Sequence, residues 1–135
     1  MSQKVKVLSQ EVIRLVDNQF EELLVKSKGL IAESRIVWRW DNEDVIVAYH
    51  PLVGSITFLN PTMAELFSLT LKEASTDLLM KYMQDTYPNV NKQVIKKDLI
   101  QALKFLFVNG FIKLKFSDKD VAIYEVEEYV KVNAS

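Results

Sequence analysis

The spacing of apolar residues changes along this chain, and that change constrains the fold more than any other feature. From Leu8 to Lys28, apolar residues recur at three- and four-residue steps, the spacing that lines one face of a helix. Between Arg35 and Leu59 they alternate in short runs rich in β-branched and aromatic residues, which are typical of strands. Helical spacing then returns up to Gly110, and alternation follows it. The sequence therefore predicts a mixed α+β fold.

Three strands are expected between Arg35 and Leu59, in one antiparallel sheet. The polar segment Asp41–Asp44 separates the first two strands as a turn. His50-Pro51 ends the second strand, because proline cannot donate a hydrogen bond to a strand ladder. The third strand is Ser55–Leu59. Such a small sheet is expected to keep at least one open edge.

The expected helices begin at residues that cap helices well. Asn60 can accept from the free amides of a first turn, and Pro61 lacks an amide that would be orphaned there. Ser75 or a neighbour begins a second helix, and Asn91 begins a third that runs to the stop at Gly110. The predicted core face of the third helix consists of Ile95, Leu99, Ala102 and Leu106.

After Gly110, the alternating runs Phe111–Phe116 and Val121–Tyr124 flank the polar turn 117–120, a pattern typical of a β-hairpin or wing. The element order predicts a winged helix-turn-helix with an N-terminal three-stranded antiparallel sheet, three helices and an extra N-terminal helix. We divide the chain into an amphipathic helical extension (1–30), a winged-helix domain (35–116), and a wing with its tail (117–135). The sequence assigns no role to the tail.

The composition argues against chemistry carried by the chain itself. There is no cysteine, so disulfides, thiolate nucleophiles and cysteine-held Fe–S clusters are excluded. The single histidine, His50, precedes Pro51 with no second histidine beside it, which favours a loop or turn role over catalysis or metal binding. Three isolated glycines form no phosphate-binding loop. We therefore expect no enzymatic activity, no metal and no other cofactor.

Charge and hydropathy suggest where the protein works. The 17 basic and 18 acidic side chains give a net charge of −1, whereas duplex-binding domains usually carry a basic excess, so nucleic acid is disfavoured as a ligand. The stretches free of charge are too short or too interrupted to span a bilayer, and no membrane association is expected. The first residues lack the apolar core of a signal peptide. A cytoplasmic location is predicted.

Several motifs follow one another in a recognisable order. They are a loop with glycine before a strand that ends in Leu-Asn, a helix with Thr and Ala in its first turn, a helix closed by Tyr-Pro, and a long helix ended by Gly-Phe-Ile. In this chain they read His50-Pro51-Leu52-Val53-Gly54, Thr57-Phe58-Leu59-Asn60, Pro61-Thr62-Met63-Ala64-Glu65-Leu66-Phe67, Asp77-Leu78-Leu79 with Tyr82 and Tyr87-Pro88, and Val94-Ile95 to Leu99, Leu103, Leu106 and Gly110-Phe111-Ile112.

Through these motifs, the span from about Val45 to Leu114 resembles the PqqD family, the chaperones of pyrroloquinoline-quinone biosynthesis. It also resembles the wider class of RiPP recognition elements, which serve ribosomally made peptides that are modified after translation. The Gly-x-x-Thr that family members often carry between their first two helices is here Thr70–Ala74. The resemblance covers about half of the chain and implies a winged-helix module that binds the leader of a precursor peptide as an added strand. It also implies presentation of that precursor to a separate modifying enzyme, such as a radical-SAM maturase.

The residues supply a physical reason for this implied function. An exposed strand edge offers unpaired N–H and C=O groups to an extended peptide, and neighbouring apolar side chains form pockets for alternate residues. We predict that the edge is Ser55, Ile56, Thr57, Phe58 and Leu59, and that Ile100, Leu103 and Phe107 form an apolar wall. Lys96 and Lys104 are predicted to attract acidic side chains of the peptide, although a solvated helix face explains them equally well.

Two other functions are compatible with the sequence. A winged-helix DNA-binding transcriptional regulator would have a similar helix order and a lysine-bearing third helix. That helix, however, has Phe105, Phe107 and Val108 where base readout needs arginine or amide side chains. The other is a structural or assembly protein that forms a homodimer through its amphipathic N-terminal helix. Trp38 and Trp40 share one side of a strand, where we expect them to pack in the core or against the N-terminal helix, or, if exposed, to mark a contact with the partner enzyme or a homodimer interface.

Overall fold

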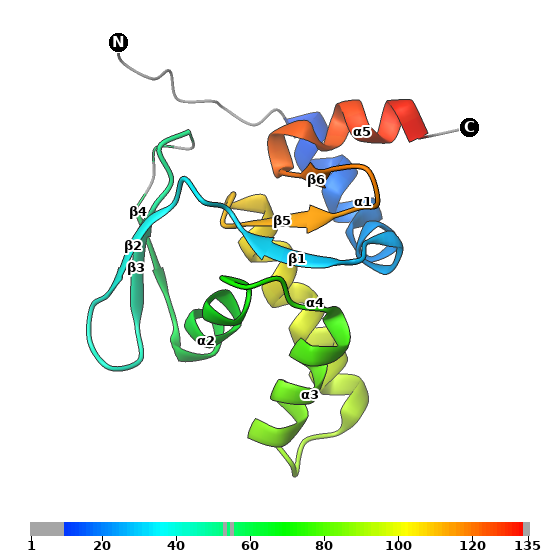
Figure 1. Cartoon of the computed structure of the whole chain (residues 1–135). Helices are drawn as coiled ribbons and strands as arrows, with labels where there is room; N and C mark the ends of the chain where they lie inside the picture. Colours follow the sequence, from blue (N-terminus) through cyan, green and yellow to red (C-terminus); the bar gives the residue numbers. More distant parts are fainter. Residues whose placement is uncertain (1–9, 53, 55, 134–135) are drawn as a thin grey trace.

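A computed structural model of the chain describes residues 10–52, 54 and 56–133 (Figure 1). In chain order its elements are α1 (Gln10–Lys26), β1 (Gly29–Ala32), β2 (Val37–Trp40), β3 (Ile46–Tyr49), β4 (Ile56–Leu59), α2 (Pro61–Leu69), α3 (Thr76–Thr86), α4 (Lys92–Val108), β5 (Ile112–Lys115), β6 (Asp120–Val121), the 3₁₀ helix η1 (Ile123–Glu125) and α5 (Val126–Asn133). The mixed α+β class is therefore confirmed.

The strands form two antiparallel sheets of three, in the orders β1-β5-β6 and β2-β3-β4. The second is the sheet that the sequence predicts, and β5-β6 is the predicted hairpin. The prediction of a single sheet is wrong, because β1 also pairs with β5, Gly29 opposite Lys115. The segment Gly-Leu-Ile-Ala shows no alternation of apolar and polar residues, and its partner strand lies far along the chain. The winged helix is not confirmed by this layout.

The predicted helix caps are confirmed by their hydrogen bonds. The backbone N–H of Met63 donates to the Asn60 side chain at 2.9 Å, at the start of α2. Ser75 accepts from the N–H of Leu78 at 3.0 Å and begins α3. Asn91 accepts from the N–H of Gln93 at 2.8 Å and begins α4. These contacts lie within three residues along the chain, so local sequence determines where each helix starts.

One hydrophobic cluster joins the helices to both sheets. The predicted core face of α4 is buried at all four of its residues, Ile95, Leu99, Ala102 and Leu106. Phe20 of α1 packs against Phe107 of α4, with ring centroids 5.6 Å apart. Phe67 of α2 packs edge-on against Phe111, which precedes β5, at 6.3 Å. The N-terminal helix is thus part of the core.

The β2-β3-β4 sheet rests on α2 through its inner face. Ile46, Ala48 and Leu59 are buried there. Trp38 and Trp40 share this face, as predicted, but Trp38 packs edge-on against Phe67 of α2 at 5.7 Å and not against the N-terminal helix. The reason is that the sheet stands at one side of the molecule with α2 against it, whereas β1-β5-β6 lies among the helices (Figure 1).

The tail contains structure that the sequence does not reveal. Tyr124, expected at the end of a strand, belongs to η1, and α5 follows it directly. The ring of Tyr129 on α5 stacks on Phe116 with centroids 4.5 Å apart. Among the described residues, no helix has both the length and the apolar character needed to cross a bilayer.

Candidate functional site

The first component of the candidate site is the edge strand β4. It pairs with β3 on one side, Tyr49 opposite Ile56 and Ile46 opposite Leu59. Within the part of the chain that the structure describes, no strand pairs with the other side of β4. Ile56 is 67% exposed and Phe58 is 64% exposed. A strand edge with free backbone groups and exposed apolar side chains is suited to pairing with another chain.

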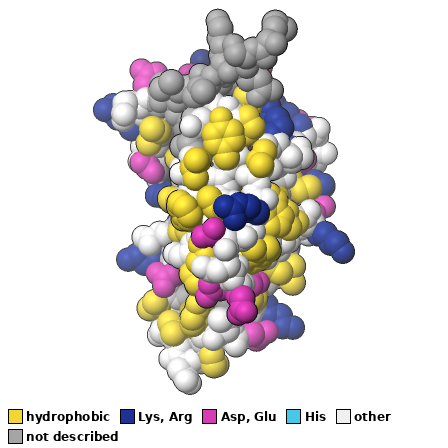
Figure 2. All heavy atoms as spheres, turned by 90° about the vertical axis from the view of Figure 1, so that its left-hand side faces the viewer, with side chains coloured by type: hydrophobic (Ala, Val, Ile, Leu, Met, Phe, Trp, Pro, Cys, Tyr) yellow, Lys and Arg dark blue, Asp and Glu magenta, His cyan; other side chains and the backbone are white. Residues whose placement is uncertain are grey.

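The second component is the outer face of the β2-β3-β4 sheet, turned away from α2. The strand register brings five apolar side chains together on it, namely Val37, Val47, Tyr49, Ile56 and Phe58. Arg39 also lies on this face, with its guanidinium 3.4 Å from the carboxylate of Asp41. Figure 2 looks at this side of the molecule and shows hydrophobic side chains spread over much of it. Exposed apolar patches of this kind mark interaction surfaces.

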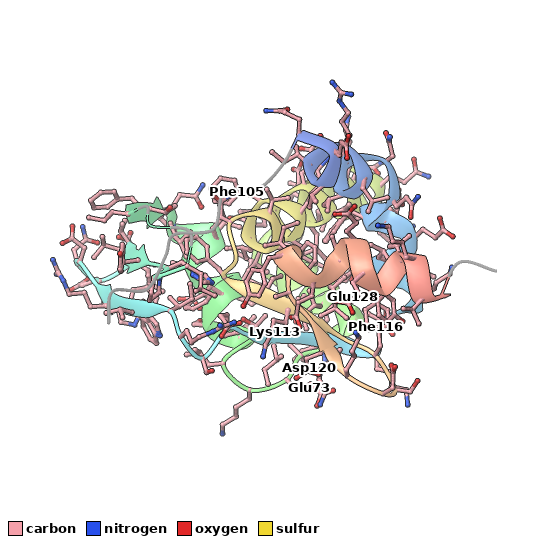
Figure 3. All side chains as sticks on the ribbon, turned by 90° about the horizontal axis from the view of Figure 1, so that it is seen from above. Glu73, Phe105, Lys113, Phe116, Asp120 and Glu128 are labelled. Carbon is pink, nitrogen blue, oxygen red and sulfur yellow. The ribbon has the colours of Figure 1, made fainter. Side chains whose placement is uncertain are left out.

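The third component is a groove of about 510 Å³ that begins where β4 ends. We call it the Phe105 groove; its walls come from α2, α3 and α4 and include Asn60, Met63, Tyr87, Val90, Ala102 and Phe105. Phe105 leaves α4 on the side of the β2-β3-β4 sheet (Figure 3). The hydroxyls of Thr62 and Tyr87 lie 2.8 Å apart in a hydrogen bond that ties α2 to the end of α3. The groove is therefore braced by two helices and begins at the end of an open strand.

The predicted apolar wall differs from the observed one. Leu103 and Phe107 are completely buried, so the prediction that they form an accessible wall is wrong. The physical reason is that α1 covers this flank of α4, with Phe20 on Phe107 and Asp17 3.5 Å from the ammonium of Lys104. Lys104 therefore faces α1. The accessible flank next to β4 carries Phe105 instead.

The remaining predicted residues separate into two places. Ile100 and Lys96 line a different groove, between α1, α3 and α4. Thr57 is half-buried and Leu59 is buried on the inner face of the sheet, so Ile56 and Phe58 alone present apolar side chains on the outer face of β4. Ser55 lies outside the described residues.

His50 has a structural position that the sequence only partly indicates. Its Nδ1 accepts from the backbone N–H of Leu52 at 3.0 Å, so it does shape the turn before β4. The ring is also buried against Gly110, where φ is +80° and an added Cβ would lie 2.7 Å from His50 Cδ2. Burial lowers the pKa of His50, Glu33 opposes that shift, and Arg35 adds to it. A neutral imidazole therefore joins the turn to the end of α4.

An ion pair beside His50 completes this junction between the two sheets. The buried carboxylate of Glu33 accepts from Nε of Arg35 at 2.9 Å and from its second guanidinium nitrogen at 3.1 Å. Burial alone would raise the pKa of Glu33, but the hydrogen bonds from Arg35 and the charge of Lys113 lower it overall. Arg35 and His50 both contact the ring of Tyr124. The sequence gives no signal for this cluster, because its members come from four segments.

Among the described residues, no group of three or more histidine, cysteine or acidic side chains is placed to hold a metal ion. Comparisons of the chain with family models, with curated proteins and with solved structures each give no match. The family resemblance therefore stays a prediction.

Proposed function

We propose that this protein is a non-catalytic accessory protein that binds the leader of a ribosomally made precursor peptide and presents it to a separate modifying enzyme. The observation that carries the proposal is the open edge of β4, which has Ile56 and Phe58 largely exposed on its outer face and leads through Asn60 into the Phe105 groove. The resemblance to RiPP recognition elements supports the same function. The proposal includes a cytoplasmic location and a radical-SAM maturase as a partner.

The mechanism of binding in this proposal is strand addition. An extended peptide would pair its backbone with the free edge of β4, and its side chains would alternate between two sides. One set would lie on the outer face of the sheet next to Ile56 and Phe58. The other set would enter the Phe105 groove, next to Met63 and Phe105. Main-chain hydrogen bonds would contribute affinity, and the two apolar surfaces would select the sequence.

The test uses the N-terminal part of a precursor peptide encoded beside the gene of this protein. We expect a fluorescently labelled leader to bind. We expect Phe105→Asp to weaken binding more than about tenfold, because a carboxylate on the mostly apolar wall would lose its water when the peptide covers it. Phe105 is 37% exposed, so the variant should fold. The matched control is Val94→Asp, which adds the same charge to α4 at a position that is 49% exposed and outside the groove.

Hydrogen exchange locates the peptide independently. Amide protons of β4 that face the open edge should become protected when the leader binds, while those of β5 should not change. Protection elsewhere, or equal affinity in Phe105→Asp and the unmodified chain, would contradict the proposal. A salt-dependent shift on nonspecific duplex DNA, with no leader binding, would favour the transcriptional regulator instead.

A further inference from the structure

A second groove lies on the other flank of α4. It has a volume of about 650 Å³ and is formed by the end of α1, by α3 and by the first half of α4. Lys96 lines it, whereas Phe105 lines the first groove. Phe105 follows Lys96 by nine positions, about two and a half helical turns, which puts the two residues on opposite sides of α4. The two grooves share no lining residue.

The second groove combines an aliphatic floor with a cationic rim. The floor contains Leu24, Met80, Leu99 and Ile100. Four lysines line the groove, and we call it the lysine groove for that reason; they are Lys28, Lys81, Lys92 and Lys96. In the described part of the chain, every ion pair involves other cations, so these four ammonium groups have no carboxylate within 4.0 Å.

The positive charge of this groove is a local excess. Its own carboxylates are Glu21 and Asp77, and neither forms an ion pair with the lysines. Four cations against two anions stand out in a chain whose net charge is −1. A complementary ligand must therefore bring carboxylates or other anions to the rim and an apolar group to the floor.

We propose that the lysine groove is a docking site for an acidic amphipathic helix of a partner protein. Such a helix would place aliphatic side chains on Met80 and Ile100, which are partly exposed, and would direct Asp or Glu side chains toward Lys92 and Lys96. Grooves between helices accept amphipathic helices in this way. The groove contains no arginine and no aromatic side chain, so it lacks the fork and the stacking surface that favour nucleotides. This inference does not depend on the leader-peptide proposal.

The experiment uses the full chain, labelled with ¹⁵N, and a synthetic 16-residue helical peptide. The peptide has leucines at three- and four-residue spacing, flanked by glutamates; a companion peptide carries glutamine at the glutamate positions. We expect the acidic peptide to bind, to bind less tightly as salt is raised, and to shift amide signals of α1, α3 and α4 around the groove. We expect the glutamine peptide to bind at least about tenfold more weakly.

Charge-reversal variants identify the lysines responsible. Lys92→Glu with Lys96→Glu should weaken binding of the acidic peptide by about tenfold or more, since two attractions become repulsions. The control is Lys97→Glu with Lys72→Glu, which makes the same change of charge at exposed positions outside the groove and should leave affinity within about twofold. All four positions are exposed, so neither double variant should impair folding.

Several results would overturn the inference. They are failure of the acidic peptide to bind, equal binding by the glutamine peptide, equal losses in the two double variants, and shifts confined to β4. Self-association of the chain alone that disappears with Lys92→Glu and Lys96→Glu would identify a second copy as the occupant. The same signals shifted by oleate, but not by the acidic peptide, would identify a fatty acid instead. Because the leader proposal predicts changes at β4, failure of either proposal leaves the other testable.

Discussion

The two sheets of this protein are of equal strand number and opposite character. In β1-β5-β6, the apolar side chains Leu30, Ile112, Leu114 and Val121 are buried in the common core. In β2-β3-β4, the outer face leaves Val37, Ile56 and Phe58 well exposed. Burial of apolar side chains stabilises a fold, and exposed ones do so much less. The first sheet is therefore expected to contribute more to the stability of the fold, and the second is the better candidate for an interaction surface.

The difference between the sheets follows from what covers them. The β1-β5-β6 sheet lies among helices, and α4 continues directly into it through Gly110 (Figure 1). The β2-β3-β4 sheet has α2 on its inner face only, where Trp38 meets Phe67. Among the described residues, nothing pairs with the free edge of β4. We expect such a surface to lower the solubility of the protein, so its presence indicates a role in binding.

The largest effect expected from this comparison comes from the buried sheet. Leu114→Ala should lower the free energy of unfolding by about 2–5 kcal/mol, because it removes buried methyl groups and leaves a cavity between β5 and the helices. Urea unfolding followed by circular dichroism measures the change. Ile56→Ala is the control in the exposed sheet and should change stability by about 0.5 kcal/mol or less. Equal losses in both variants would show that the two sheets do not differ in this way.

The sequence predicts the parts of the fold that depend on neighbouring residues. Asn60, Ser75 and Asn91 cap their helices through bonds to residues two or three positions away. The turn between β2 and β3 and the break after β3 are also local, and both are confirmed. These features could be predicted because their energetics are contained in short segments.

The features that the sequence does not reveal depend on distant contacts. Leu103 and Phe107 look like a spare apolar flank of α4 until α1 is placed on them. Strand β1 has no recognisable pattern of its own and exists through its pairing with β5. For the candidate site, the edge at Ile56 and Phe58 could be predicted from a short run of strand residues. The wall at Phe105 could not, because it depends on which flank of α4 stays open.

A smaller effect is expected at the junction between the sheets, where His50 contacts Gly110. Burial lowers the pKa of His50 below its ordinary value of about 6.5, so the unfolded chain binds a proton more readily than the folded one. The stability contributed by the neutral ring is complete above about pH 6.5 and is lost as the pH falls toward the lower pKa of the folded state. Glu33 faces His50, but its own lowered pKa lies below this window.

His50→Asn separates this titration from the rest of the protein. The asparagine oxygen can still accept from the N–H of Leu52, but the side chain does not titrate. Urea unfolding between pH 7.5 and pH 5.5 should show a decline in stability for the unmodified chain and a flatter profile for the variant. The absolute stability of the variant will also fall, because asparagine fills less of the space beside Gly110. Identical slopes would show that another group controls the pH dependence.

The smallest effect on stability is expected on the outer face of β4, and it separates folding from binding. Phe58→Thr keeps a residue that suits a strand and removes a ring that is 64% exposed, so the free energy of unfolding should change by about 0.5 kcal/mol or less. An added strand would place every second side chain next to position 58, and loss of one cross-strand pair costs about 0.2–1 kcal/mol. Leader affinity should therefore fall by up to about fivefold, less than in Phe105→Asp.

Isothermal calorimetry and urea unfolding on the same preparation measure both quantities. A large loss of stability would show that Phe58 stabilises the fold as the residues of the buried sheet do. Unchanged affinity would show that the peptide does not contact the outer face of β4, and the Phe105 groove would remain as the peptide site.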